Sequence, residues 1–422
     1  MLKSIDGLQP IEAVTDDLSN RGSTGPKDRE AEMKAFTFQA PPNILFEAGA
    51  SRKLAELVAE YDVSRILLVT DKGVRNAGLT RNAEKALIDG GCELTVFEDV
   101  EADPPSHVIE RAVAICRDKG VGLVASIGGG SALDTAKLVA YLAKTPDRLD
   151  DIYGVGLAKG ERLPLLLVPT TAGTGSEVTP IAIVTTPTTE KKGVVSPRLL
   201  PDWAILDPEL TLGLPAHVTA ATGIDAMVHA IEAYTSKHKK NLMSDQLARQ
   251  ALALLSANVR IVCTDGSNLE ARSQMLLGSM LAGMAFANSP VAAVHALAYP
   301  IGAIFHVPHG LSNALVLTQV LRFNLPEAEA LYAELAPIVD PKTEGLSTDQ
   351  KARLFVDAIS AICRDCNVPA SLADVGITAK DLKKLAEDAM KQTRLLVNNP
   401  REVSFDDALA IYTEALGNRA AA

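Results

Sequence analysis

Short apolar runs alternate with helical stretches over the first half of this 422-residue chain, and this alternation constrains the fold most. Helical patterns such as NAEKALIDGG and HVIERAVAICRDKG separate the runs. Continuous apolar runs are typical of strands buried on both faces, and intervening helices supply the crossovers of a parallel sheet. The pattern therefore predicts a parallel α/β domain, with strands at residues 65–70 (RILLVT), 93–97 (ELTVF), 122–127 (GLVASI) and 163–171 (LPLLLVPTT).

The second half of the chain shows helical patterns only. Examples are SDQLARQALALLSANVRIV, QKARLFVDAISAICRD and AKDLKKLAEDAMKQT. Strands followed by helices alone indicate two domains with different architectures. The segment LGLPAHVTA supplies the Gly and Pro of a boundary, and the polar, weakly periodic start indicates a flexible leader. We predict a leader over residues 1–33, an α/β domain over 34–215 and an all-helical domain over 216–422.

Composition narrows the classes of partner. The net charge is −11, with 52 acidic and 41 basic residues, which argues against a nucleic-acid partner because phosphate binding needs a basic face. No apolar run approaches the roughly 20 residues that span a bilayer, so we expect no membrane partner. Five scattered cysteines fit a reducing cytoplasm. Cys363 and Cys366 form C-x2-C, but without a second pair we interpret them as helix neighbours.

Four residues of the second half have the character of metal ligands. Asp225 and His229 form D-x3-H in GIDAMVHAIEAY, and His295 and His309 follow in VHALAYPIGAIFHVPHG. Residues four apart lie on the same helix face, so the first pair can bind one ion together. One carboxylate with three imidazoles suits a divalent transition metal. Each residue alone also fits a hydrogen-bonded core histidine or a carboxylate at a helix N-terminus.

A glycine-rich turn follows the third predicted strand. Gly128, Gly129, Gly130 and Ser131 stand between GLVASI and the helical pattern ALDTAKLVAYLA. Glycines let backbone amides approach a ligand, and a helix N-terminus offers free N–H groups to a pyrophosphate. The turn is not G-x-G-x-x-G, so an ordinary Rossmann half is not indicated. By itself the segment also fits a bare tight turn.

Two more polar segments follow predicted strands. Asp71 comes directly after RILLVT, where a carboxylate can accept hydrogen bonds from ribose hydroxyls and repel a 2′-phosphate. The alternative for Asp71 is a helix cap. Thr170, Thr171 and Thr174 lie in VPTTAGTGSEVTP, at the end of the fourth strand and in the loop that follows it. Their hydroxyls fit the wall of a cofactor groove or, equally, a structural loop.

Taken together, these segments resemble the iron-dependent (group III) alcohol dehydrogenases. The matching blocks are SIGGGSALDTAK, PTTAGTGSEVTP, SPRLLPDWAILDPELT, GIDAMVHAIEAY and VHALAYPIGAIFHVPHG, in the order and spacing of that family. The resemblance runs from Phe36 to the C-terminus and leaves out only the leader. It implies an N-terminal α/β domain that binds NAD(P) and a C-terminal helical domain that carries the metal.

The resemblance also implies roles for single residues. The family's metal ligands fall on Asp225, His229, His295 and His309, which would hold Fe(II), with Zn(II) as the other metal that fits. An Asp at position 71 is typical of members that prefer NAD. Lys191 or Lys192 lies where the family places a basic residue near the cofactor, and Lys192 is our candidate. The remaining cofactor-binding candidates are Gly128, Gly129, Gly130, Ser131, Asp134, Thr170, Thr171 and Thr174, and Lys137 completes the glycine block.

The chain departs from the family near the substrate. Many members carry a further histidine four residues after the third ligand, and here that position is Tyr299. Tyr299 either supplies a hydroxyl to proton transfer or fills space, and packing is the interpretation we favour. His306, three residues before His309, is a candidate either to support the ligands by hydrogen bonding or to shuttle a proton, and Phe286 is a candidate pocket aromatic. Leu395, in RLLVNNPRE, belongs to a segment that approaches the cleft in relatives.

The resemblance therefore implies an enzyme, a homodimer or larger homo-oligomer, that transfers a hydride between NAD(H) and a small alcohol or aldehyde bound to the metal. With the cysteine usage above, we expect it in the cytoplasm. One alternative is a hydroxyacid–oxoacid transhydrogenase that retains its NAD. A second is a lyase like dehydroquinate synthase, against which Asp225 argues because that relative has a Glu at the first ligand position. A third is a non-catalytic NAD-binding or filament-forming protein, which the intact ligand set gives no reason to choose.

Overall fold

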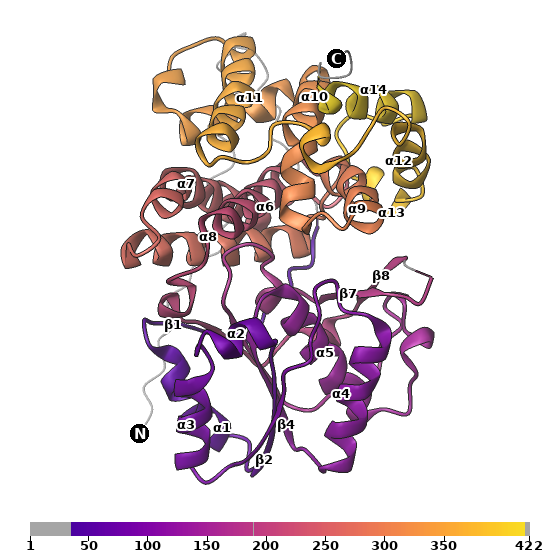
Figure 1. Ribbon diagram of the computed structural model, residues 1–422. Helices are drawn as coiled ribbons and strands as arrows, with labels where there is room; N and C mark the ends of the chain where they lie inside the picture. Colours follow the sequence, from indigo (N-terminus) through magenta and orange to yellow (C-terminus); the bar gives the residue numbers. More distant parts are fainter. Residues whose placement is uncertain (1–34, 189, 418–422) are drawn as a thin grey trace, which may run out of the picture. The chain divides into compact units, whose positions relative to one another are not determined.

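The computed structural model describes residues 35–188 and 190–417, and the predicted leader lies outside them. A six-stranded parallel sheet organises the first half of the chain (Figure 1), with the order β1-β9-β6-β4-β2-β3. This confirms the predicted parallel α/β class. In chain order the strands are β1 (Asn43–Phe46), β2 (Arg65–Val69), β3 (Glu93–Phe97), β4 (Leu123–Gly128), β6 (Leu165–Pro169) and β9 (Trp203–Leu206).

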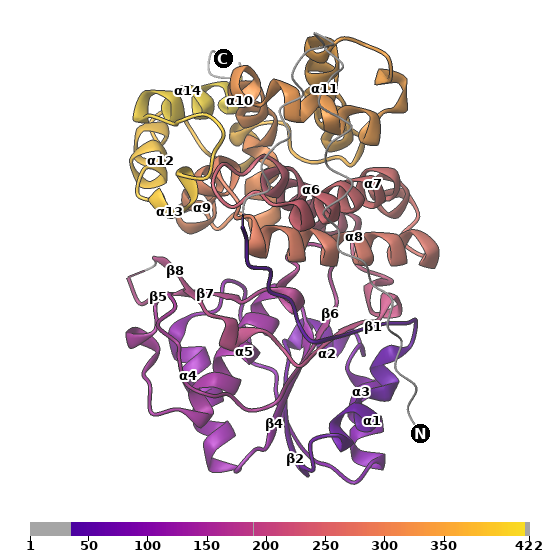
Figure 2. The same ribbon diagram turned by 180° about the vertical axis from the view of Figure 1, so that it is seen from behind.

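Helices cover both faces of this sheet, as Figures 1 and 2 show from opposite sides. Side chains alternate across a strand, so Leu67 and Val69 of β2 join the core beneath α4 and α5, while Ile66 and Leu68 join the core beneath α1 and α3. All four are fully buried, which explains why β2 is a continuous apolar run. The helices of this part are α1 (Leu54–Ala59), α2 (Lys72–Asn76), α3 (Arg81–Asp89), α4 (Ser106–Asp118) and α5 (Gly130–Lys144).

A second, three-stranded sheet lies beside the first and was not predicted. β7 (Ile181–Thr185) pairs antiparallel with β8 (Lys191–Val195), and β8 pairs parallel with the two-residue β5 (Gly154–Val155). The Asp134 carboxylate of α5 fixes this sheet, because its Oδ2 accepts a hydrogen bond from the Ile183 backbone N–H at 2.9 Å. The small sheet is thereby held next to the N-terminal end of α5.

The second half is helical, as predicted. α6 is buried over most of its length, and its neighbours α7, α8 and α10 pack around it. Within the described residues no single helix is long and apolar enough to cross a membrane, although α8 and α9, bent by 105°, meet that test as a pair. The division into domains at residues 215 and 216 stays a prediction. The helices are α6 (Ala216–Thr235), α7 (Leu242–Thr264), α8 (Leu269–Asn288), α9 (Ala293–Phe305), α10 (His309–Val339), α11 (Thr348–Asp365), α12 (Leu382–Ala389), α13 (Thr393–Leu396) and α14 (Phe405–Leu416).

Candidate functional site

The structure brings Asp225, His229, His295 and His309 together. One ligand atom from each residue lies within 4.8 Å of those of the others. Asp225 and His229 are one turn apart on α6, His295 lies in the first turn of α9, and His309 is the first residue of α10. The first three side chains are almost fully buried and His309 is partly exposed, so the cluster opens to one side.

A sharp corner between α9 and α10 places the two later histidines. α9 ends at Phe305, and its C-cap His306 has a left-handed backbone with φ of 55°. Pro308 then precedes α10. A left-handed residue at a helix C-cap turns the chain out of its path. His306 is exposed and is absent from the pocket that the other histidines line. His306 thus lies at the corner and outside the cavity lining, and a part in proton transfer stays a prediction.

The rings of two histidines are held by hydrogen bonds. The His295 Nδ1 donates to Glu232 Oε2 at 2.7 Å, and the His229 Nδ1 donates to the Gly173 carbonyl at 3.2 Å. Since these acceptors require a proton on Nδ1, each Nε2 keeps its lone pair. Metal-ligating histidines commonly have this arrangement. Sequence reasoning missed Glu232, although it lies three residues after His229 on the same face of α6.

Asn313, also missed, lies beside the cluster on α10, four residues after His309. Its Nδ2 donates to Asp225 Oδ1 at 2.6 Å and lies 3.2 Å from His295 Nε2 and 3.3 Å from His309 Nε2. Its buried Oδ1 has no hydrogen-bond partner within the described residues. The Asn313 amide nitrogen therefore faces the lone pairs of Asp225, His295 and His309. The Asn313 Oδ1 remains beside it as a buried acceptor.

Burial and charge set the protonation states of the cluster. Burial lowers the pKa of His229 to about 3 and also lowers the pKa of His309. Burial alone would raise the pKa of Asp225, but the nearby imidazoles and Asn313 hold it below its usual value. Neutral imidazoles around an ionised carboxylate are the forms that bind a metal. The donor set, its burial and its oriented rings thus fit a divalent transition metal.

The glycine turn and the threonine loop lie against each other at the carboxyl edge of the large sheet. Thr170 N–H donates to the Gly128 carbonyl at 3.0 Å. A Cβ on Gly130 would lie 2.8 Å from Thr174 Cγ2, so only glycine fits there without a shift. A Cβ on Gly129 would lie 3.7 Å from its nearest neighbour, Thr171 Cγ2, which is an ordinary van der Waals distance. No side chain caps the N-terminus of α5, which leaves its amides for a ligand such as a pyrophosphate.

Asp71 follows β2. From β2 the chain moves outward to β3 and then crosses back to β4 on the other side of β2, so the direction of the strand connections reverses between β2 and β4. Ligands of open α/β sheets bind at such a point. The Asp71 Oδ1 accepts from Val74 N–H at 2.9 Å and caps α2, as the alternative interpretation expected. Its other oxygen lies 3.8 Å from where a Cβ on Gly128 would stand. One carboxylate oxygen thus caps the helix while the other faces the glycine turn.

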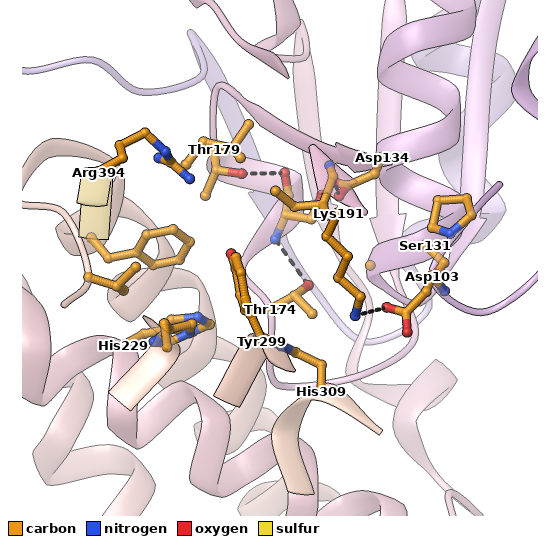
Figure 3. A pocket seen from close by; sticks show the side chains of 18 residues that line it. Asp103, Ser131, Asp134, Thr174, Thr179, Lys191, His229, Tyr299, His309 and Arg394 are labelled. Carbon is orange, nitrogen blue, oxygen red and sulfur yellow. Dashed lines mark hydrogen bonds and ion pairs between the residues drawn. The ribbon is translucent and has the colours of Figure 1, made fainter. Parts of the chain in front are cut away.

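A cavity of about 210 Å³ joins the glycine turn to the histidine cluster (Figure 3). Such a volume is small beside the roughly 300–1,000 Å³ of pockets for drug-sized ligands. Its lining comes from both halves of the chain. These residues are Asp103, Pro104, Gly130, Ser131, Asp134, Thr174, Ser176, Thr179, Ile181, Ile183, Lys191, His229, Phe286, Val291, His295, Tyr299, His309 and Arg394.

Two predicted aromatic residues line this cavity. Phe286 stacks on His229 with ring centroids 4.3 Å apart, and Tyr299 lies 5.9 Å from His309. Burial raises the pKa of the Tyr299 hydroxyl, which therefore stays protonated near neutral pH. These contacts agree with a wall role for both rings.

The two lysines of β8 point to opposite sides, as neighbours on a strand do. Lys191 lines the cavity, and its Nζ lies 2.7 Å from Asp103 Oδ1. Lys192 is exposed and lies over the Tyr153 ring, outside the lining. Of the two lysines, Lys191 is therefore the one that faces the cavity, and a cofactor role for Lys192 stays a prediction.

The segment RLLVNNPRE does reach the cavity, but through a different residue. Leu395 is buried in the helical core with 1% of its surface exposed, while its neighbour Arg394 lines the cavity. α13 has only four residues, so its sequence offers no periodicity from which the facing side could be predicted. Cys363 and Cys366 lie at the end of α11 with free thiols, away from the cavity lining.

Comparison with known proteins matches the chain to two family models and to many relatives. Residues 41–208 match the model described as iron-containing alcohol dehydrogenase. Residues 219–416 match the model described as Fe-containing alcohol dehydrogenase family, C-terminal. The long-chain-alcohol dehydrogenase 1 of Geobacillus thermodenitrificans is 40% identical over 370 residues, which cover 87% of this chain and 93% of the relative.

Solved structures agree with this match. A crystal structure of 1,3-propanediol oxidoreductase has a TM-score of 0.88 and 35% identity, covering 90% of this chain and 100% of the other. The sulfoacetaldehyde reductase of Bifidobacterium kashiwanohense in complex with NAD⁺ has a TM-score of 0.82 and 29% identity, covering 91% of this chain and 100% of the other.

Proposed function

The chain belongs to the iron-containing alcohol dehydrogenase family, and from this premise we propose that it transfers a hydride between NAD(H) and a small alcohol or aldehyde. One observation carries the proposal: the histidine cluster and the N-terminal end of α5 line the same cavity. A metal site and a site for a dinucleotide are thus within reach of one small substrate.

Each group of residues has a part in this reaction. Asp225, His229, His295 and His309 would hold the metal, and Glu232 would orient His295. The bound metal supplies a Lewis acid for the alcohol or carbonyl oxygen, and the nicotinamide supplies or accepts the hydride.

The cofactor would bind across the carboxyl edge of the large sheet. The amides at the start of α5 would bind the pyrophosphate. Thr174 and Thr179, which line the cavity, would form the wall along the nicotinamide. We propose NAD rather than NADP because the Asp71 carboxylate would repel a 2′-phosphate. The solved relative in complex with NAD⁺ supports this choice.

Substrate positioning falls to the other wall. Phe286 and Val291 present apolar surface that excludes water, which strengthens electrostatic interactions inside the cavity. The protonated Tyr299 hydroxyl can donate a hydrogen bond but cannot act as a base near neutral pH. Holding alcohol and nicotinamide in one orientation is the main contribution of these side chains.

The test is NADH oxidation, followed by absorbance, with an aldehyde panel and protein reconstituted anaerobically with Fe(II) or Zn(II). We expect turnover with NADH, and we propose Fe(II) as the working metal from the family. His295→Ala should lose the metal and the activity while circular dichroism stays unchanged. His238→Ala, which removes an exposed histidine, is the matched control. Unchanged metal content in His295→Ala, or no turnover of any aldehyde by the wild type, would contradict the proposal.

Location and assembly stay predictions. We propose a cytoplasmic protein because all five cysteines are free, as expected in a reducing compartment. We propose a homodimer or larger homo-oligomer from the family resemblance. Light scattering after size-exclusion chromatography measures the assembly directly, and a mass of one chain would contradict it.

A further inference from the structure

Arg394 brings a positive charge without a partner to the cavity. Two side chains with a permanent positive charge line it, Lys191 and Arg394. Lys191 is neutralised by Asp103, with Nζ and Oδ1 2.7 Å apart. Within residues 35–188 and 190–417 the Arg394 guanidinium has neither an ion pair nor a hydrogen bond. Arg394 is exposed, so its five N–H donors face water and are open to a ligand that enters the cavity.

The position of Arg394 indicates substrate rather than cofactor. Figure 3 shows it on the side of the cavity opposite Ser131 and Asp103, which lie at the glycine turn where the pyrophosphate is expected. Its Nη2 lies 3.9 Å from where a Cβ on Gly193 of β8 would stand, so Arg394 borders the small sheet at the end of the cavity remote from the glycine turn.

On this side of the cavity, only the guanidinium of Arg394 among the lining side chains carries a positive charge that could bind an anion. Phe286 and Val291 are apolar, so the guanidinium is the group on this side that could bind a negative charge at any pH. The planar fork of arginine matches the oxygens of a carboxylate or sulfonate with two parallel hydrogen bonds. A neutral alkyl chain would cover the guanidinium without replacing its hydrogen bonds to water, which is unfavourable.

We propose that Arg394 determines specificity, and that the substrate is a short alcohol or aldehyde with an anionic group at the end remote from the reacting carbon. The inference rests on the function proposed above, since the reacting end must face the histidine cluster. The cavity of about 210 Å³ favours a short chain. In the reduction, NADH gives a hydride to the carbonyl carbon and becomes NAD⁺, the oxygen takes a proton from water, and the anion is unchanged.

Paired substrates test the proposal on the metal-loaded protein. The pairs are 4-oxobutanoate with butanal, and 2-oxoethanesulfonate with propanal, each reduced with NADH. We expect the wild type to prefer the charged member, and the larger kcat/KM tells whether the anion is a carboxylate or a sulfonate. Arg394→Gln should lose about 10- to 100-fold in kcat/KM for the charged aldehyde, mainly through KM, because a hydrogen bond to a charged group is lost.

Control variants separate the loss of the fork from the loss of any nearby charge. Arg394→Lys keeps the charge without the fork and should fall between wild type and Arg394→Gln. Lys391→Gln removes an exposed cation, paired with Asp388, that lies outside the cavity lining, and should behave as wild type. The dissociation constant of NADH, measured by fluorescence, should be equal in all four proteins.

Three results would overturn the proposal: no preference for charged aldehydes, an equal effect of Arg394→Gln on both members of a pair, or weaker NADH binding in that variant. Calorimetry with 4-hydroxybutanoate and 1-butanol decides the same point without turnover. Tighter binding of the hydroxy acid that depends on Arg394 supports the proposal, and equal binding contradicts it. Absence of turnover together with Arg394-dependent binding would refute only the proposed reaction.

Discussion

Replacing Glu232 by Gln tests the link between a buried carboxylate and metal binding. Both carboxylate oxygens are engaged, Oε2 with His295 Nδ1–H and Oε1 with the Val294 backbone N–H, each at 2.7 Å. Glutamine has one acceptor oxygen, so one donor would face an NH₂ group instead. His295 is 2% exposed, which leaves water little access to replace the lost bond. The His295 ring would lose its fixed orientation. It would also lose the neighbouring anion that makes Nε2 a stronger metal ligand.

The expected loss is in metal affinity. Loss of such orienting contacts costs about 10- to 100-fold in affinity, or about 1.4 to 2.7 kcal/mol, and the engagement of both oxygens places Glu232→Gln at the upper end. Competition between the metal-free protein and a chromophoric chelator for Zn(II) measures the dissociation constant. Glu177→Gln is the matched control, because it makes the same change at another buried site outside the cluster. This variant should leave the dissociation constant for Zn(II) unchanged. Equal affinities for wild type and Glu232→Gln would refute the reasoning.

Three further predictions concern other parts of the site. Asp71→Asn should raise kcat/KM for NADP relative to NAD by about tenfold or more, because the carboxylate no longer repels the 2′-phosphate; an unchanged ratio by NAD(P)H absorbance would contradict this. Burial raises the pKa of Glu177 to about 7, so the folded state binds more protons than the unfolded state between pH 4.5 and 7, and stability should fall as pH rises through that window. Urea unfolding should show a decrease on the order of 3 kcal/mol there, and Glu177→Gln should remove it. Tyr299→Phe should keep most of its activity, and a loss of several orders of magnitude would make its hydroxyl a proton donor.

The parts of the fold that could be predicted depend on local patterns. The run at residues 93–97 is β3 to the residue, because alternating and apolar residues reveal a strand by themselves. The small sheet could not be predicted. β5 has two residues and pairs with β8 some 40 positions later in the chain, so it exists only through that tertiary contact.

The parts of the site that could be predicted also depend on local sequence patterns. Asp225 and His229 came from helical spacing, and Glu232 and Asn313 could have been found by extending that spacing one turn along α6 and α10. The choice between Lys191 and Lys192 depended on the register of β8, and the choice between Arg394 and Leu395 on the orientation of a one-turn helix. Neither is set by its own sequence, since packing against the rest of the chain decides which side chain faces the cavity.

The central claim is that metal and nicotinamide share one cavity. Diffraction from crystals grown with Fe(II) and NAD⁺ under anaerobic conditions, with data collected at the iron edge, tests this directly. We expect one strong anomalous peak, from an iron bound by Asp225, His229, His295 and His309, with the pyrophosphate on Gly129 and Gly130 and the nicotinamide in the cavity between. An iron peak elsewhere, or a nicotinamide outside the cavity that Phe286 and Tyr299 line, would contradict it.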